Sequence, residues 1–326
     1  MKTVISVNDL QKTYKPKRGQ KSPEVCAVAG ISFEVPRGEF FGLLGPNGAG
    51  KTTTIGILTT RVRPTGGAAL VDGIDVAQDP VAVKSRIGVV PQNNNLDRSL
   101  TGRENLLFHA EYFGIGKQVR EQRADELLAR FQLSERAAEK VNVYSGGMAQ
   151  RLKIARSLMH DPAILFLDEP TTGLDPQARR AMWDLLAELN SKGQTIFLTT
   201  HYMEEADQLC RRVAIMDHGK LLALDSPSAL KTKVPGGYVI DLQVRRDRAR
   251  NSAGLDLETA LRSLSGVVDV KASDSLLRLY ADKAEGLLAN AMRLASEQGV
   301  LVTDAHVSEP SLENLFLHLT GRSLRE

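Results

Sequence analysis

A glycine-rich loop with a single lysine is the segment whose residues most clearly predict chemistry. It reads Gly-Pro-Asn-Gly-Ala-Gly-Lys-Thr-Thr and satisfies the pattern Gly-x-x-x-x-Gly-Lys-[Ser/Thr]. Its glycines let successive backbone N–H groups converge on one anion, Lys51 supplies a cation for the β- and γ-phosphates, and the Thr52 hydroxyl is placed to hold Mg²⁺. An ordinary glycine-rich turn would leave the lysine unexplained. The sequence therefore predicts nucleotide binding by nine residues: Gly45, Pro46, Asn47, Gly48, Ala49, Gly50, Lys51, Thr52 and Thr53.

Two adjacent carboxylates at the end of an apolar run predict a catalytic and metal-binding pair. The run 164–167 is followed directly by Asp168 and Glu169. Carboxylates at the end of a buried strand are costly unless a cation or water meets them. We expect Asp168 to hold Mg²⁺ together with Thr52, and Glu169 to polarise the water that attacks the γ-phosphate. A solvated strand end is the ordinary alternative, but the phosphate loop in the same chain favours catalysis.

A second anion site is predicted where Ser145, Gly146 and Gly147 precede a helical run over 151–159. The unpaired N–H groups at the start of that helix and the serine hydroxyl could together bind a phosphate. A simple serine N-cap is the alternative. Because the chain already carries a phosphate loop and Ser145 lies 24 positions before Glu169, we favour phosphate binding.

The elements that must position these residues alternate between apolar runs and helical patterns up to about residue 230, which predicts an α/β core. The mostly apolar run 39–44 enters the phosphate loop as a strand buried on both faces should, and 52–58 continues as a helix. Further strands are predicted over 88–91, 163–167, 195–199 and 212–216.

Strand signals disappear between residues 103 and 140, where apolar residues recur at three- and four-residue spacing. Helices are predicted over Glu104–Phe113 and Val119–Phe131. We therefore expect a helical subdomain, covering about residues 93–160, within the α/β domain.

A different pattern begins after Pro235-Gly236-Gly237. The predicted order is β-α-β-β-α-β, which resembles a ferredoxin-like fold. Its strands are expected over 238–244, 267–271, 276–280 and 300–306, its helices over 257–264 and 284–297, and a closing helix over 311–319 that ends near Gly321. No convergent set of catalytic residues is visible there, so a structural or regulatory module is favoured.

Composition restricts the remaining possibilities. The 326 residues include 42 basic and 39 acidic ones, and a net charge of +3 demands neither nucleic acid nor an anionic membrane surface as a partner. The only cysteines, Cys26 and Cys210, lie far apart, which suits a reducing cytosol and argues against a disulfide framework. The first residues lack the apolar core of a signal peptide, and no stretch approaches about 18 consecutive apolar residues, so we expect a chain that does not cross a membrane by itself.

Taken together, the motifs over residues 1–230 resemble the ATP-binding subunits of ABC transporters. Tyr144 to Met148 is similar to that family's Leu-Ser-Gly-Gly-Gln signature, with Tyr for Leu and Met for Gln, and its Ser-Gly-Gly is intact. The resemblance implies an α/β P-loop NTPase cassette with a helical subdomain, followed by a small α+β domain. It assigns residues 1–234 to the cassette and 235–326 to a regulatory or dimerisation domain.

Four further residues acquire roles from this resemblance. Gln92 matches a glutamine that contacts Mg²⁺ and water and senses the membrane partner. Asp175 matches the loop that crosses the dimer interface, and His201 matches a switch histidine that contacts the γ-phosphate. Tyr14 resembles the aromatic residue that stacks on adenine, although the segment Lys15–Glu24 after it is long and basic, as a solvated loop would be.

The resemblance also implies partners. In this family the signature of one subunit completes the phosphate site of another, so we expect a head-to-tail dimer of two copies closing around two ATP molecules, or a paired homologue. The segment 93–105 after Gln92 lies where transporters dock the coupling helices of integral membrane permease subunits. We therefore expect a cytoplasmic protein held at the inner face of the cell membrane through its permease, with no nucleic acid partner.

The last ninety or so residues, closing with the segment 310–317, resemble the tails of bacterial ATPases related to daunorubicin-resistance and nodulation-oligosaccharide exporters. This implies export of a drug-like, lipid-linked or polysaccharide substrate. A soluble ABC ATPase acting on ribosomes or DNA is the main alternative, disfavoured by a single cassette, no long heptad-repeat arm and no cysteine-rich zinc element. A regulatory protein without turnover is a third possibility, weakened by the presence of both Glu169 and His201.

Overall fold

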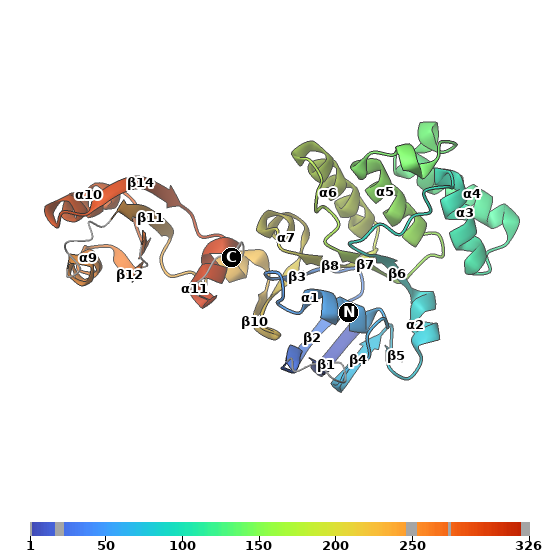
Figure 1. Cartoon of the computed structure of the whole chain (residues 1–326), viewed down its shortest axis with the longest axis horizontal. Coiled ribbons are helices and arrows are strands. Elements are labelled where there is room, and N and C mark those ends of the chain that lie inside the picture. The colour runs from blue at the N-terminus through green and yellow to red at the C-terminus, as the bar shows by residue number, and fades with distance from the viewer. Residues whose placement is uncertain (1, 17–22, 246–252, 273–274, 321–326) are drawn as a thin grey trace. The chain divides into compact units, whose positions relative to one another are not determined.

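The computed structural model describes residues 2–16, 23–245, 253–272 and 275–320 (Figure 1). The chain separates into two compact units between Pro227 and Ser228, and each is described by itself. Residues 17–22 of the basic segment after Tyr14, and Gly321 at the expected end of the last helix, lie outside the described residues.

The first unit is built on a six-stranded sheet in the order β10-β9-β3-β8-β7-β6. Five of its strands run parallel, and β10 pairs antiparallel with β9 at one edge. Every residue of β3, β7 and β8 is buried, as expected for apolar strands covered on both faces. The bounds are β3 (Phe40–Leu44), β6 (Ile87–Val90), β7 (Ile164–Asp168), β8 (Thr195–Thr200), β9 (Arg212–Asp217) and β10 (Lys220–Asp225). The carboxyl ends of β3, β7 and β8 lie at one edge of this sheet, which is where the predicted site residues follow.

A second, antiparallel sheet covers the same unit in the order β2-β1-β4-β5. The sequence reasoning did not foresee it as a separate layer. Helix α1 contacts strands of both sheets, and Figure 1 shows it between them. Stacked rings of Phe33, Phe41 and Phe197 join the two sheets in one core. The bounds are β1 (Thr3–Tyr14), β2 (Val25–Pro36), β4 (Gly66–Val71), β5 (Ile74–Asp75) and α1 (Lys51–Leu58).

The expected helical subdomain is present beside the β6 edge of the parallel sheet (Figure 1). A capping box starts α3: the Thr101 hydroxyl accepts from the Glu104 amide, and the Glu104 carboxylate accepts from the Thr101 amide. The subdomain contains α3 (Gly102–Tyr112), α4 (Lys117–Arg130), the short 3₁₀ turns η1 (Ser134–Arg136) and η2 (Val141–Val143), and α5 (Gly146–Ser157). The remaining helices of the unit are α2 (Pro80–Arg86), α6 (Pro176–Ser191) and α7 (Met203–Leu209); α8 (Pro227–Lys231) follows at the boundary.

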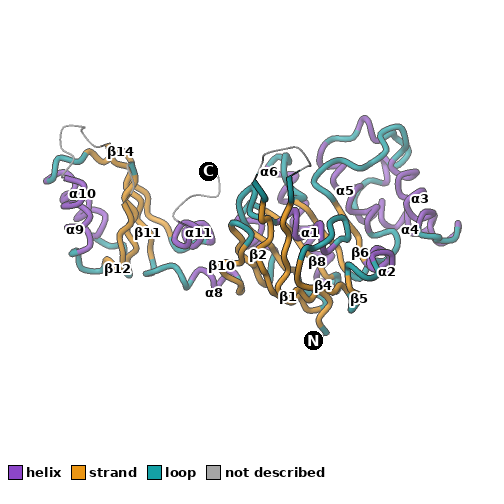
Figure 2. The backbone as a smooth tube through the Cα atoms, turned by 60° about the horizontal axis from the view of Figure 1, so that its bottom comes forward, coloured by secondary structure: helices purple, strands orange, loops and turns teal. Residues whose placement is uncertain are grey.

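The second unit has one four-stranded antiparallel sheet in the order β12-β13-β11-β14, with α9 and α10 packed on it (Figure 2). The observed order of elements is β-α-β-β-α-β followed by a helix, and α10 begins three residues later than the expected 284. The ferredoxin-like assignment of this unit stays a prediction. The bounds are β11 (Tyr238–Arg245), α9 (Ala253–Arg262), β12 (Val267–Ala272), β13 (Leu276–Ala281), α10 (Leu287–Glu297), β14 (Leu301–Ser308) and α11 (Leu312–Thr320).

A helix that spans a bilayer must be both long and apolar, and no helix within the described ranges meets these requirements.

Candidate functional site

The glycine-rich loop connects β3 to α1 and takes a conformation that only small residues can adopt. Gly48 and Gly50 have φ angles of 80° and 106°, and a Cβ on Gly50 would collide with the carbonyl oxygen of Ala27. Gly50 is also the N-cap of α1 and has no side chain to occupy the first amides of the helix. The loop thus leaves backbone N–H groups at a helix N-terminus, as anion binding requires.

Lys51 lies at the start of α1 and is buried, with only 4% of its surface exposed. Its Nζ donates to the carbonyl oxygens of Gly45 (2.7 Å) and Pro46 (3.1 Å) and lies 3.5 Å from Oε1 of Glu169. Burial lowers the pKa of this amine, and the Glu169 charge acts in the opposite direction. The structure therefore holds the predicted phosphate-binding cation directly against the predicted catalytic carboxylate.

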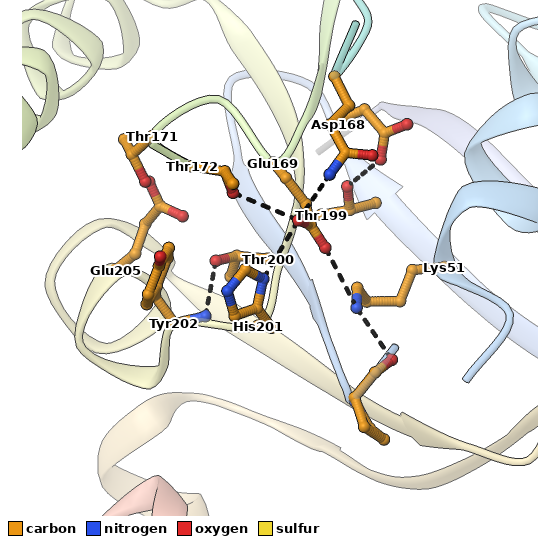
Figure 3. Close-up of polar contacts among 12 residues, drawn as sticks. Lys51, Asp168, Glu169, Thr171, Thr172, Thr199, Thr200, His201, Tyr202 and Glu205 are labelled. Atoms are coloured by element: carbon orange, nitrogen blue, oxygen red, sulfur yellow. Dashed lines mark hydrogen bonds and ion pairs between the residues drawn. The ribbon is translucent and has the colours of Figure 1, made fainter. Parts of the chain in front are cut away.

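Glu169 is the residue on which the predicted catalytic groups converge (Figure 3). Its Oε2 accepts from Nε2 of Gln92 (3.2 Å) and from the hydroxyl of Thr172 (3.3 Å), and lies 3.2 Å from Nδ1 of His201. These partners come from segments that follow β6, β7 and β8. The neighbouring His201 ring, and to a smaller extent Lys51, keeps the pKa of Glu169 below its ordinary value despite burial. An ionised carboxylate positioned in this way can orient and polarise a water molecule.

Asp168 lies one residue earlier, at the end of β7, and points to different partners. Its Oδ1 accepts a 2.6 Å hydrogen bond from the hydroxyl of Thr199, and its Oδ2 is 4.0 Å from Arg61. Burial raises the pKa of this carboxyl group, and the Thr199 hydrogen bond acts against that rise. Only 3% of Asp168 is exposed. The two adjacent carboxylates are thus held in distinct environments, Glu169 among nitrogen donors and Asp168 beside a hydroxyl.

A cavity of ≈ 300 Å³ is lined by residues of the phosphate loop and by Glu169. Among the predicted site residues, it is lined by Tyr14, Pro46, Asn47, Gly48, Gly50, Lys51, Thr52, Thr53, Gln92 and Glu169. Eight others do not line it: Gly45, Ala49, Asp168, His201, Asp175, Ser145, Gly146 and Gly147. His201 contacts the lining residue Glu169, as described above, and Asp168 directly precedes Glu169 in the chain.

Tyr14 ends β1 at the mouth of this cavity. Its ring is 40% exposed, and Nζ of Lys12 lies 5.0 Å from the ring centre. An exposed aromatic face on a nucleotide-sized cavity is suited to base stacking. The adenine contact of Tyr14 stays a prediction.

Ser145 caps α5, because its hydroxyl accepts from the Met148 amide at 3.3 Å. Ser145 and Gly146 are exposed at the surface, which leaves the N-terminus of this helix accessible. Tyr144, where the resemblance has Leu, uses its hydroxyl to donate to the Arg136 carbonyl at 2.7 Å. The unusual tyrosine therefore ties the signature segment to η1.

Asp175 caps α6 in the same way, with its carboxylate accepting from the Ala178 amide at 2.8 Å. The starts of α5 and α6 are neighbours, since a Cβ on Gly147 would lie 3.6 Å from the Ala178 side chain. Two helix N-termini thus lie together on a surface that does not line the chain's own cavity. The exposed backbone amides at these two helix starts could bind an anion.

The sequence reasoning missed Thr172 and Thr199, the hydroxyl partners of the two carboxylates. Both have a visible signal. Thr199 and Thr200 end an otherwise apolar strand directly before His201, and Thr172 follows Glu169 by three residues. Thr199 is buried, and buried polar residues are usually hydrogen-bonded, whereas Thr172 is exposed and its only signal is its closeness to Glu169 in the sequence.

A second surface of interest is a groove between the α/β core and the helical subdomain. A cavity of ≈ 570 Å³ has an apolar floor with cations from Arg61, Lys84 and Arg156, and no carboxylate is among its described lining residues. A neighbouring cavity of ≈ 530 Å³ shares Arg156 and includes Asp97. The groove therefore has a basic part and an acidic part.

Several known ATP-binding proteins are similar to this chain over nearly its whole length. A family model described as "ABC transporter" matches residues 28–172. Daunorubicin resistance ATP-binding protein DrrA3 of Streptomyces coeruleorubidus is 40% identical over 99% of this chain and 98% of its own length. Linearmycin resistance ATP-binding protein LnrL of Bacillus subtilis is 38% identical over 99% and 100% of the two chains. Nod factor export ATP-binding protein I of Ralstonia nicotianae is 39% identical over 99% and 95%.

Solved structures of ATP-binding cassettes resemble a large part of the chain. A dimeric post-hydrolysis state of the ATP-binding cassette MJ0796 bound to ADP and Pi has a TM-score of 0.62 at 28% identity, covering 68% of this chain and 98% of that one. CbiO1 from Clostridium perfringens, part of the ABC transporter complex cbiONQ, has a TM-score of 0.64 at 27% identity, covering 72% and 92%.

Proposed function

Because this chain belongs to the ABC transporter family of ATP-binding proteins, we propose that it is the ATP-hydrolysing subunit of an exporter, and that its catalytic residues are Glu169, His201 and Gln92. The α/β cassette fold predicted from sequence is confirmed by the solved cassettes. One observation carries the residue assignment: the Glu169 carboxylate is held by Gln92, Thr172 and His201 at the edge of the cavity that the phosphate loop lines.

Each group has a part in hydrolysis. The backbone amides of residues 45–53 and Lys51 would bind the β- and γ-phosphates. To do so, the Lys51 amine would move away from the Glu169 carboxylate and towards the phosphates. Glu169, then free of the lysine, would accept a proton from the attacking water. His201, which is 28% exposed beside Glu169, would contact the γ-phosphate.

Mg²⁺ fits the residues present. A buried carboxylate with a raised pKa is expensive to ionise, and a divalent cation would offset that cost at Asp168. Thr52 and Gln92 present further oxygen atoms at the cavity. Magnesium usually takes one or two protein oxygens and leaves the rest of its shell to phosphates and water, so Thr52, Gln92 and Asp168 are sufficient. The ion would neutralise charge between the phosphates.

The exposed starts of α5 and α6 support a composite site formed by two copies. Ser145, Gly146 and Gly147 would close on ATP held by the partner copy, and Asp175 would lie at the interface between them. In a head-to-tail dimer both phosphate sites are then completed in trans. ATP would stabilise the closed dimer, and hydrolysis would release it.

Complementation between two inactive variants tests this arrangement. Lys51→Ala disables the phosphate loop, and Ser145→Asp keeps a residue that caps helices well but repels phosphate. Each variant alone should be inactive. A mixture should recover about a quarter of normal turnover, because about half of randomly assorted dimers are mixed and each mixed dimer has one intact site. Absence of any recovery, with dimers formed, would show that each chain completes its own site.

A membrane permease is the proposed second partner, which would hold the protein at the inner face of the cell membrane. The groove beside the segment 93–105 suits a short helix with apolar residues, an acidic side chain towards Arg61 and Lys84, and a basic one towards Asp97. Rim residues Val81 and Tyr112 are 75% and 87% exposed, which leaves apolar surface for such a helix. Co-purification with an integral membrane protein, lost on Arg61→Glu together with Lys84→Glu, would support this docking. Co-purification with ribosomes or DNA would favour the alternative class.

The named relatives concern resistance to daunorubicin and linearmycin and export of Nod factor. We propose a substrate of the same kind, drug-like, lipid-linked or oligosaccharide, moved outward by the permease. Residues 235–326 are proposed as a regulatory or dimerisation domain. Removing 236–326 should leave ATP binding intact and change dimer stability, whereas a folded truncation unable to bind ATP would contradict the division at 234.

A further inference from the structure

A buried carboxylate outside the proposed catalytic set lies close behind it. Glu205 on α7 has no exposed surface, and its Oε1 accepts from the hydroxyl of Thr171 (2.8 Å) and from Nε1 of Trp183 (3.1 Å). Thr171 is also fully buried. Burial of a carboxylate costs several kcal/mol unless its partners compensate, so such a group needs a reason to be there. Figure 3 shows Glu205 and Thr171 together on the side of Glu169 away from Lys51.

The three hydrogen-bonded residues belong to three segments that carry site residues. Thr171 lies two residues after Glu169. Glu205 lies in the first turn of α7, four residues after His201, and the Ala206 amide of this turn donates to the Tyr202 carbonyl. Trp183 lies on α6, the helix that Asp175 caps. One carboxylate oxygen therefore joins the general-base turn, the histidine turn and the helix at the proposed dimer surface.

The turn that carries Glu169 needs support from its surroundings. Glu169 has a φ of 50°, in the left-handed region where residues other than glycine are strained. Within the turn, the Thr172 amide donates to the Glu169 carbonyl at 3.3 Å and the Thr172 hydroxyl donates to its carboxylate at 3.3 Å. Both bonds are long and internal to the turn. Two shorter bonds tie the turn to other elements: the Glu169 amide donates to the Thr199 carbonyl of β8 at 3.0 Å, and Thr171 donates to Glu205 of α7 at 2.8 Å.

We propose that Glu205 is a positioning residue for ATP hydrolysis, which holds the Glu169 turn through Thr171 and fixes it relative to His201 and α6. The inference rests on the proposed function and adds to it a residue that touches neither nucleotide nor water. A displacement of about 1 Å at a reacting group can lower a rate on the order of a hundredfold. Loss of this anchor should therefore act on turnover and not on nucleotide binding, which the phosphate loop provides.

The decisive variant is Thr171→Val, which removes the hydroxyl and keeps the branched shape. We expect kcat to fall about tenfold or more, with the KM for MgATP changed less than about threefold. Thr171→Ser keeps the hydroxyl and should turn over at nearly the normal rate. Glu205→Gln should do so too, because its amide oxygen can still accept the hydrogen bond from Thr171. Glu205→Leu combined with Thr171→Val should be no slower than Glu205→Leu alone, because Glu205→Leu already breaks the Thr171–Glu205 bond, together with the bond from Trp183.

Thr195→Val is the matched control. Thr195 is another fully buried threonine, at the start of β8 and away from His201, and its hydroxyl accepts from the Gly38 amide at 2.9 Å. It should lower thermal stability in the same way as Thr171→Val without lowering kcat. An unchanged kcat in Thr171→Val, or equal losses of kcat in both variants, would overturn the proposal.

Hydrogen exchange of the nucleotide-free protein gives a readout that does not depend on turnover. Thr171→Val should speed exchange of the amides in 169–174, whereas Thr195→Val should not. Trp183 is the single tryptophan of the chain, so its emission should also shift in Glu205→Leu. If the unmodified protein failed to hydrolyse ATP, the proposed function would fall, and the exchange result would still decide the anchor. Unchanged exchange in 169–174 would overturn it.

Discussion

Replacing Glu169 by Gln tests the catalytic assignment most directly. The amide has the size of the carboxylate, and its oxygen can still accept from Gln92 and Thr172, which donate at 3.2 and 3.3 Å. What is lost is the negative charge and the ability to take a proton from water. General base catalysis contributes roughly 10²- to 10⁴-fold, so kcat should fall by that factor.

ATP binding should survive this change and become tighter. In the unmodified protein Nζ of Lys51 is 3.5 Å from the Glu169 carboxylate, an attraction of about 5 kcal/mol at an effective dielectric constant of about 20, most of it offset by desolvation. A bound phosphate must replace Glu169 as the partner of Lys51, and its negative charge must also approach the negative carboxylate. Glu169→Gln removes both obstacles, while Lys51 keeps the carbonyl oxygens of Gly45 and Pro46 as partners.

Three measurements on one preparation of the Glu169→Gln variant test these expectations. Phosphate release gives kcat, a fluorescent ATP analogue gives affinity, and light scattering with and without ATP and Mg²⁺ gives the monomer–dimer balance. The variant should be slow, bind ATP at least as tightly, and accumulate as a dimer. Glu135→Gln, at an exposed position of η1, is the matched control and should behave as the unmodified protein. Turnover reduced less than about fivefold would refute the base assignment, and a variant that stayed monomeric with ATP bound would refute the trans site.

Three other perturbations follow from the described contacts. Lys51→Ala should abolish productive ATP binding, measured by nucleotide titration, because no other side chain in the loop supplies a cation. Tyr144→Phe removes the hydrogen bond to the Arg136 carbonyl and should lower the free energy of unfolding by about 1 kcal/mol, measured by denaturant titration, with kcat little changed. Burial, with help from Arg156, lowers the pKa of His109 to about 4, so folding favours its neutral form. As pH falls from about 6.5 to about 4, His109 takes up a proton in the unfolded chain before it does so in the folded one. The free energy of unfolding therefore decreases, by at most about 3 kcal/mol. His109→Gln should make this decrease with falling pH smaller.

Each of these three expectations has a contrary result. Normal turnover in the lysine variant would remove the phosphate-loop assignment. Unchanged stability in the tyrosine variant would mean that water replaces the lost bond without cost. Equal slopes of stability against pH for His109→Gln and the unmodified protein would place the acid sensitivity elsewhere, for example at His160, whose pKa burial also lowers.

Local patterns were enough to predict the elements that carry the site. The strand before the phosphate loop, the strand ending at Asp168 and the strand ending before His201 are continuous apolar runs, and their burial on both faces is what such runs require. Parallel pairing then places their carboxyl ends together without further information. The helix start at Ser145 was also visible, because serine caps helices by a local hydrogen bond, whereas the N-cap at Thr101 lies three residues before the predicted start at Glu104.

Side-chain partners across the chain were not predictable in this way. The Thr171–Glu205 bond joins residues 34 positions apart, and the Thr199–Asp168 bond joins residues 31 apart. Nothing in the local sequence of α7 says that Glu205 faces inward, since Glu204 beside it is exposed. The antiparallel sheet was missed as a layer because β1 joins the other strands through β4, where residues as distant in the sequence as Ile5 and Val71 pair.

The separation of the site into two surfaces on one chain has a physical reason. The cavity by the phosphate loop is lined by groups that bind phosphate and move a proton, whereas the starts of α5 and α6 offer only backbone amides and small capping side chains. In the first set, Lys51 already pairs with Glu169 within the chain, so these two charges compensate each other without nucleotide. The second set has exposed amides that water satisfies. In the proposed dimer, a nucleotide phosphate between two copies would satisfy both sets at once, and this shared demand would make closure depend on ATP.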